Sequence, residues 1–172
     1  TLSDGTATHT ATLTITVSSS NNAPSATNDT DAVNEDATIT ESSGSELLVA
    51  DDTDADSDTL TVTQIAVTGG SNSSVTSSTT HSNGTSITGT YGTLVVGANV
   101  SYTYTADQSA ADDLDASDTA TDSFTYTISD GTATDTATLI ITVTGINDAP
   151  VADDETGAVN EDATLTVTDG TS

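Results

Sequence analysis

The segment Ala137-Thr138-Leu139-Ile140-Ile141-Thr142-Val143 decides the fold, because apolar residues occupy every odd position. In an extended chain the four odd-numbered residues share one face, and threonine occupies most of the other. The same alternation recurs in Phe124-Thr125-Tyr126-Thr127-Ile128 and in Val100-Ser101-Tyr102-Thr103-Tyr104. Half-buried strands of this kind are typical of antiparallel sheets. The sequence therefore predicts a folded all-β chain with a thin core.

The composition excludes several classes of protein. The 172 residues include no Lys or Arg and 27 Asp plus Glu, which gives a formal net charge of −27. Such a chain cannot neutralise phosphate, so we expect it to bind neither nucleic acid nor an anionic membrane surface. The absence of Cys, Met and Trp removes disulfides, thiolate metal sites and cysteine nucleophiles. No stretch approaches the roughly 18 apolar residues of a membrane span, so membrane insertion is not expected.

The chain contains an internal repeat with an offset of 126 residues. Residues 1–46 align without a gap with residues 127–172, and 28 of the 46 pairs are identical. The two prolines of the chain, Pro24 and Pro150, are related by the same offset and lie at the expected junctions. The repeat predicts three parts: the last strand and linker of a preceding repeat at residues 1–24, one complete repeat at residues 25–150, and the first strand of a following repeat at residues 151–172.

Within the complete repeat, short alternating segments and turn signals favour a sandwich of two sheets. Leu60 and Val62 have the opposite parity to Ile65 and Val67, which predicts a β-bulge between the two pairs. The Ser/Thr/Gly-rich residues 69–90 are expected to form a long hairpin or an exposed loop. The expected strands lie near residues 32–40, 46–51, 59–67, 85–90, 93–96, 100–105, 121–129 and 135–144.

Acidic residues gather in a run that starts at Asp51. Four of them occupy alternate positions: Asp52, Asp54, Asp56 and Asp58. In a loop, this spacing turns successive oxygens toward one point, as a hard cation with six to eight oxygen ligands requires. The chain offers no basic partner, so a divalent cation is the remaining counter-charge, and oxygen-only ligands favour Ca²⁺ over Zn²⁺. The run is also compatible with an ordinary solvated loop.

Two further acidic groups are compatible with either a metal site or a solvated surface. One follows the alternating segment at residues 100–104, and the other lies at the junction near Pro150. The first comprises Asp107, Asp112, Asp113, Asp115 and Asp118, and the second comprises Asn147, Asp148, Asp153, Asp154 and Glu155. For the first group, metal binding and a solvated surface are about equally expected.

The sequence gives no indication of catalysis. His9 and His81 have no Cys or second His nearby, so both are expected at the surface. No G-x-S-x-G nucleophile motif is present, and the few aromatic residues provide no obvious cleft for a substrate. We therefore expect a protein that is not an enzyme.

Several motifs carry a family likeness. The closing segment Ser129-Asp130-Gly131-Thr132-Ala133, continuing to Asn147-Asp148-Ala149-Pro150, resembles that of VCBS-type and cadherin-like bacterial repeats. Tyr91-Gly92-Thr93-Leu94 and Thr121-Asp122-Ser123-Phe124 resemble motifs of the same repeats, in the expected order. The resemblance covers nearly all of residues 25–150. It implies an Ig-like or cadherin-like antiparallel β-sandwich, arranged in tandem in a large secreted surface protein, typically an adhesin.

In the related cadherins Ca²⁺ lies at the domain junctions, and the resemblance implies which residues would bind it here. Four ligands would face the following repeat: Glu35, Asp115, Asn147 and Asp148. Three would face the preceding repeat, near Asn21 and Asn22: Asp54, Asp56 and Asp130.

Three positions depart from the cadherin pattern. Gly145 and Ser117 stand where cadherins have acidic ligands, and the first linker, Asn21-Asn22, has no Asp. One or two ions per junction are therefore expected, with Asp52 or Asp58 substituting.

Together these features predict a non-catalytic, Ca²⁺-stiffened spacer repeat of an extracellular bacterial adhesin, secreted or at the cell surface, acting in cell adhesion or biofilm formation. Its partners would be the neighbouring repeats of the same chain. An alternative is a subunit of a self-assembling extracellular filament, a homo-polymer with strand exchange, because the face of Ala11, Leu13, Ile15 and Val17 needs a partner. A third interpretation gives residues 69–90 a role in recognising a glycan or another protein.

Overall fold

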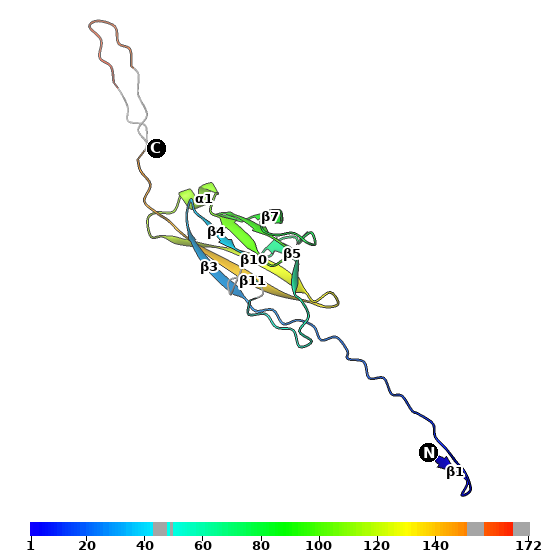
Figure 1. The fold of residues 1–172 in the computed structure, drawn as a ribbon. Helices are drawn as coiled ribbons and strands as arrows, with labels where there is room; N and C mark the ends of the chain where they lie inside the picture. Colours follow the sequence, from blue (N-terminus) through cyan, green and yellow to red (C-terminus); the bar gives the residue numbers. More distant parts are fainter. Residues whose placement is uncertain (43–47, 49, 151–156, 167–172) are drawn as a thin grey trace.

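The computed structural model describes residues 1–42, 48, 50–150 and 157–166, and in this part of the chain two β-sheets pack face to face (Figure 1). The predicted all-β sandwich of two sheets is confirmed. The five-stranded sheet has the order β3 (Asp29–Asn34), β11 (Thr134–Thr144), β10 (Thr119–Ser129), β5 (Thr61–Val67) and β6 (Ser73–Ser74). The four-stranded sheet has the order β4 (Thr38–Glu41), β9 (Tyr102–Thr105), β8 (Thr93–Val96) and β7 (Thr85–Thr88).

The β10–β11 hairpin forms the centre of the larger sheet. Its two 11-residue strands pair antiparallel along their whole length. The alternation predicts which side chains are buried: Phe124, Leu139 and Ile141 are fully buried between the sheets. Phe124 meets Tyr104 of β9 edge to face, with ring centroids 6.1 Å apart, so this aromatic pair joins the two layers.

The single strand expected at residues 32–40 is wrong. The chain forms β3 in one sheet and β4 in the other, separated by a turn in which Asp36 has φ 60° and the Ala37 N–H donates to the Asn34 carbonyl at 3.2 Å. Asp is one of the few non-glycine residues that tolerate this left-handed conformation. β3 pairs in parallel with β11, whereas β4 pairs antiparallel with β9. The turn therefore lets one continuous segment supply an edge strand to each of the two sheets.

The predicted bulge is confirmed. Thr127 pairs with Gln64 and Ile128 pairs with Val62, so Thr63 is the extra residue of β5. The insertion brings both Val62 and Ile65 to the inner face, where each is fully buried.

The other expected strands differ in detail. The strands at 59–67, 85–90, 93–96, 100–105, 121–129 and 135–144 match observed ones to within two residues at each end. Half of the strand expected at 46–51 lies outside the described residues; of the three described, none is in a strand, and Leu48 is fully buried. Residues 69–90 are neither one hairpin nor an exposed loop, because β6 pairs with β5 and β7 pairs with β8. This segment crosses between the sheets and buries Val75.

The two ends of the described chain extend from opposite ends of the sandwich (Figure 1). Residues 1–9 form a short hairpin of β1 (Leu2–Ser3) and β2 (Thr8–His9). Residues 10–22 form no strand here, and Leu13, Ile15 and Val17 are 83%, 75% and 89% exposed, because no neighbouring strand in the described part of the chain pairs with them.

One helix is present among the described residues, α1 (Ser109–Asp112). No helix in the described part of the chain has the length and apolarity to cross a bilayer.

Candidate metal centre

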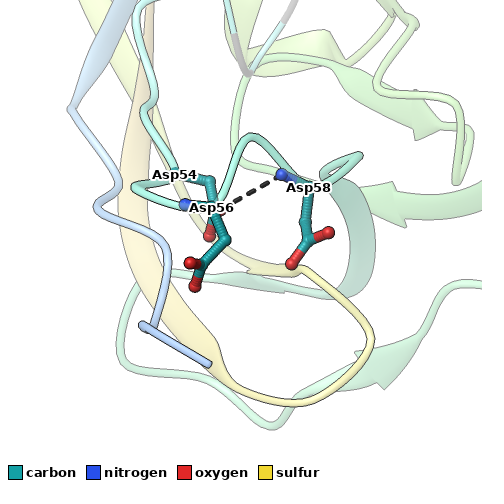
Figure 2. A group of neighbouring side chains, drawn as sticks. All are labelled: Asp54, Asp56 and Asp58. Carbon is teal, nitrogen blue, oxygen red and sulfur yellow. Dashed lines mark hydrogen bonds between the residues drawn. The ribbon is translucent and has the colours of Figure 1, made fainter. Parts of the chain in front are cut away.

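The loop between β4 and β5 brings three carboxylates together. Asp54, Asp56 and Asp58 each offer a carboxylate oxygen, and these oxygens all lie within 4.8 Å of one another (Figure 2). The loop folds around Asp54, whose Oδ1 accepts the N–H groups of Asp56 at 2.8 Å and Asp58 at 3.1 Å. Ser57, with φ 62°, makes the turn between them. The alternating spacing thus gives the expected convergence of oxygens.

This group of residues fits a hard cation. Every donor is oxygen, and Oδ2 of Asp54 is buried without a hydrogen-bond partner. Three carboxylates this close repel one another, and the chain has no Lys or Arg to offset the charge. A Ca²⁺ ion could use the three carboxylates and complete its shell with carbonyl and water oxygens.

The linker that precedes the sandwich lies against the same loop. The Asn22 backbone N–H and side-chain Nδ2 donate to Oδ2 of Asp56 at 2.7 and 3.2 Å, and Nδ2 of Asn21 donates to Oδ2 of Asp130 at 2.9 Å. Hydrogen bonds from the Ala133 N–H, the Asn21 side chain and the Thr132 N–H hold the pKa of Asp130 below its ordinary value. The structure therefore brings Asp54, Asp56 and Asp130 to the linker asparagines.

Asp52 lies apart from the three carboxylates. Its neighbour Thr53 forms an isolated antiparallel bridge with Ser25, and Asp52 Oδ1 accepts the Thr27 N–H at 2.6 Å. Its Oδ2 is buried without a hydrogen-bond partner. Burial raises the pKa of Asp52, with Asp51 and Asp135 adding to the increase. Among the described residues, the group that could hold an ion comprises Asp54, Asp56 and Asp58 but not Asp52.

The opposite end of the sandwich contains the other four expected ligands. Glu35, in the turn after β3, is 1% exposed; its Oε1 accepts the Ile146 N–H at 2.5 Å, and its Oε2 has no hydrogen-bond partner. Asp115, Asn147 and Asp148 are all exposed. In the described residues at this end, no three carboxylates meet the spacing of the Asp54 group.

The packing around Gly145 explains one departure from the cadherin pattern. The Gly145 N–H donates to the Asp118 carbonyl at 2.9 Å, and the Ser117 N–H donates to the Gly145 carbonyl at 3.0 Å. A Cβ at position 145 would lie 2.4 Å from the Asp115 carbonyl oxygen. The loop after α1 thus packs too closely for an acidic side chain at this position.

Two polar centres were not anticipated from the sequence, although the alternation contained a signal for both. Asp122 has the inward parity of Phe124, and Asp29 has the inward parity of Val33. A carboxylate at an inward position of a strand has to find donors. Asp29 Oδ2 accepts the Tyr126 hydroxyl at 2.5 Å. Burial raises the pKa of Asp29 to about 6, with Asp51 and Asp52 contributing and the Tyr126 hydrogen bond opposing.

Asp29→Asn is expected to stabilise the protein at neutral pH. The native pKa lies above the ordinary value of an aspartate carboxyl, so the native state binds more protons between about pH 4 and pH 6, and ionised Asp29 lowers stability as pH rises through that window. Asparagine removes the charge and keeps an oxygen for Tyr126. After allowance for solvent screening, the gain at pH 8 is expected to be about 1 kcal/mol and to vanish near pH 4. Urea unfolding at both pH values measures it.

The exposed Asp113→Asn is the matched control for this prediction, because it removes the same charge from an acidic chain. Its gain should be smaller and should not follow the same pH window. Equal gains in the two variants would show that only the net charge matters.

A comparison with known proteins agrees with this architecture. The chain matches the family model described as bacterial cadherin-like domain over residues 21–145, which is 125 of its 172 residues. The match begins at the linker asparagines and ends at Gly145, so it includes both sheets and the three-carboxylate loop. A search of curated proteins gave no match. Because the family model covers well over half of its length, the chain belongs to the bacterial cadherin-like domain family.

Proposed function

We propose that the chain is a non-catalytic spacer repeat of a secreted or cell-surface bacterial adhesin of the VCBS type, and that Ca²⁺ stiffens it. Bacterial cadherin-like domains are structural and adhesion-type repeats, typically without enzymatic activity and usually extracellular. The observation that supports the proposal best is the group of Asp54, Asp56 and Asp58 beside the linker.

The residues of this loop would act mechanically. Asp54, Asp56 and Asp58 would bind the ion, which supplies positive charge that offsets their repulsion. Asp56 already accepts two hydrogen bonds from Asn22, so fixing its carboxylate also fixes the linker. Asn21 holds the same linker to Asp130 in the loop between β10 and β11. An ion at this point would therefore restrict how the linker leaves the sandwich.

The acidic loops lie at the two ends of the sandwich. The Asp54 loop and Asp130 lie where the linker meets it, and the loop around α1 lies where β11 leaves it (Figure 1). With a complete repeat at residues 25–150 and an offset of 126, successive repeats would bring one acidic end against another. These ends repel without a cation. Bound Ca²⁺ would turn such a string of repeats into a stiff rod.

Ca²⁺ is expected to stabilise the chain in high NaCl, where general screening of its charge is already complete. At a hundredfold excess over the dissociation constant, an ion that binds the native state alone adds about 2.7 kcal/mol. For a chain of this size, that corresponds to a rise in Tm of roughly 5–10 °C. Thermal unfolding followed by circular dichroism, with Ca²⁺ and with EDTA, measures the shift.

A pair of double variants makes this experiment specific to the site. Asp54→Asn with Asp56→Asn should abolish most of the shift, whereas Asp112→Asn with Asp113→Asn removes the same charge and should keep it. A full shift in the first variant would show that the ion binds elsewhere. No shift in the unsubstituted chain would contradict Ca²⁺ stiffening and leave the carboxylates as a solvated surface.

The second candidate function is a subunit of a self-assembling extracellular filament with strand exchange. The exposed row of Leu13, Ile15 and Val17 favours it, because a strand with one apolar face is stable only when paired. The Ile15→Asp variant described in the next subsection separates this candidate from the spacer, because only the filament candidate predicts that this substitution abolishes association.

A further inference from the structure

We propose that the outer face of the five-stranded sheet is a surface through which two copies of this chain associate side by side. By this face we mean the side chains of β3, β5, β10 and β11 that point away from the core. Its centre is the β10–β11 hairpin, where eleven of the twelve outward residues are Thr or Ser and the twelfth is Ile140. Ile140 is 36% exposed, and it is the one large apolar side chain among these twelve residues.

The outer face has no carboxylate, although the chain has 27. The acidic residues within its strands have inward parity and accept hydrogen bonds there: Asp29, Asp31, Asp122 and Asp135. All other described carboxylates lie in loops, turns, the N-terminal segment, β4 or the helix α1. The negative charge is thus segregated away from the broadest surface of the sandwich.

This segregation identifies the occupant as a second copy. The chain has no Lys or Arg, so no part of one copy offers a positive patch to the acidic loops of another. Two copies can approach without bringing like charges together only over an uncharged surface. Pairing the outer face with itself about a twofold axis keeps the acidic ends away from the contact.

The size of the face also suits such a contact. Its four strands have 6, 7, 11 and 11 residues, and at about 3.4 Å per residue and 4.8 Å per strand they cover roughly 600 Å². A standard interface buries about 800 Å² on each partner, so the contact between single repeats is expected to be weak. The four-stranded sheet has strands of four residues each and offers less than half this area. Its outward Thr93 also hydrogen bonds the Asp107 carboxylate, so its outer face is not free of charge.

The internal repeat preserves the same face, which is an independent observation. Residues 8–18 align with β11, and every outward position from Thr8 to Ser18 is again Thr or Ser. Two differences stand out in this segment: His9 replaces the inward Asp135, and Thr14 replaces the outward Ile140. Weak lateral contacts repeated along one chain add through effective concentration and can raise avidity by 10²–10⁴. The face therefore suits bundling of parallel rods.

Sedimentation equilibrium of the chain tests the proposal. The protein concentration runs from micromolar to near-millimolar. The buffer contains high NaCl, which screens the acidic ends, and EDTA, which removes Ca²⁺. The apparent mass is expected to rise with concentration from the monomer toward the dimer. Thr121→Asp with Thr136→Asp adds two carboxylates per copy at exposed positions of the face, and the dissociation constant should rise about tenfold or more.

The matched control is Thr40→Asp with Thr88→Asp, two exposed threonines on the other sheet, which should leave the dissociation constant unchanged. Ile140→Asp is a third variant that should weaken association, and circular dichroism confirms that each variant folds. A monomer at every concentration overturns the proposal, as does a Thr121/Thr136 variant that associates like the unsubstituted chain. Association that is lost instead in Ile15→Asp would assign the contact to the N-terminal row and the filament candidate.

Discussion

Replacing Asp122 with alanine is expected to lower the free energy of unfolding by about 3–5 kcal/mol. The carboxylate is 3% exposed and accepts four hydrogen bonds. Three come from the backbone N–H groups of Thr90, Tyr91 and Gly92, at 2.8, 3.1 and 3.1 Å, and one comes from the Tyr104 hydroxyl at 2.7 Å. Alanine would leave all four donors without their acceptor, and each unsatisfied buried donor is costly. Urea unfolding in high NaCl measures the loss.

Two controls separate this effect from charge removal and from packing. Asp113→Ala removes the same charge from an exposed loop position, and its effect should lie within about ±0.5 kcal/mol. Asp122→Asn keeps one acceptor oxygen and should lose less than Asp122→Ala. A loss below about 1 kcal/mol in Asp122→Ala would show that water or neighbouring carbonyls replace the carboxylate.

The large expected effect follows from the position of Asp122 between the two layers. It belongs to β10 of the five-stranded sheet, whereas its donors lie in the β7–β8 turn and in β9 of the four-stranded sheet. The turn packs so closely that a Cβ at Gly89 would lie 2.3 Å from Asp122 Oδ2, and one at Gly92 would lie 2.4 Å from the Thr105 carbonyl. A single carboxylate therefore fixes the turn against the opposite sheet, and a chain with a thin core depends on such contacts.

Side-chain parity explains which parts of the fold the sequence predicts. It identified β10 and β11, whose inward residues are mostly apolar, and it located the bulge because Val62 and Ile65 differ in parity yet both face the core. It could not find the change of sheet between β3 and β4. Val33 and Ile39 have the same parity on either side of that turn. The inner faces of both sheets share one core, so a strand that changes sheets keeps its pattern unbroken.

The residue spacing also predicted only part of the candidate metal site. The alternating aspartates predicted convergence, and Asp54, Asp56 and Asp58 do converge. Asp52 was grouped with them because spacing alone treats the four as equivalent. The pairing of Thr53 with Ser25 directs Asp52 to Thr27 instead, and that pairing joins residues far apart in the sequence. Local spacing contains no information about such a long-range contact.

Truncating Tyr126 to alanine is expected to lower the free energy of unfolding by about 3–5 kcal/mol, since the ring is fully buried at the centre of the larger sheet. Tyr126→Phe isolates the hydroxyl and should cost about 1–2 kcal/mol at neutral pH. The hydroxyl lies 2.9 Å from the Thr27 carbonyl, 2.5 Å from Asp29 Oδ2 and 2.9 Å from the Leu48 carbonyl. It thus joins β10 to the end of the linker and to the segment before the acidic loop.

The pH dependence of Tyr126→Phe identifies the acceptor that matters most. The hydroxyl has one proton, and because burial raises the pKa of Tyr126 it keeps that proton throughout the usual pH range. Its hydrogen bond favours ionised Asp29, so removing it should cost more at pH 8 than at pH 4.5, below the Asp29 pKa of about 6. Tyr91→Phe, a half-buried ring, is the control and should show no such difference. Equal losses at the two pH values would show that the hydroxyl donates to the Thr27 or Leu48 carbonyl instead. The ionisation of Asp29 would then not depend on Tyr126.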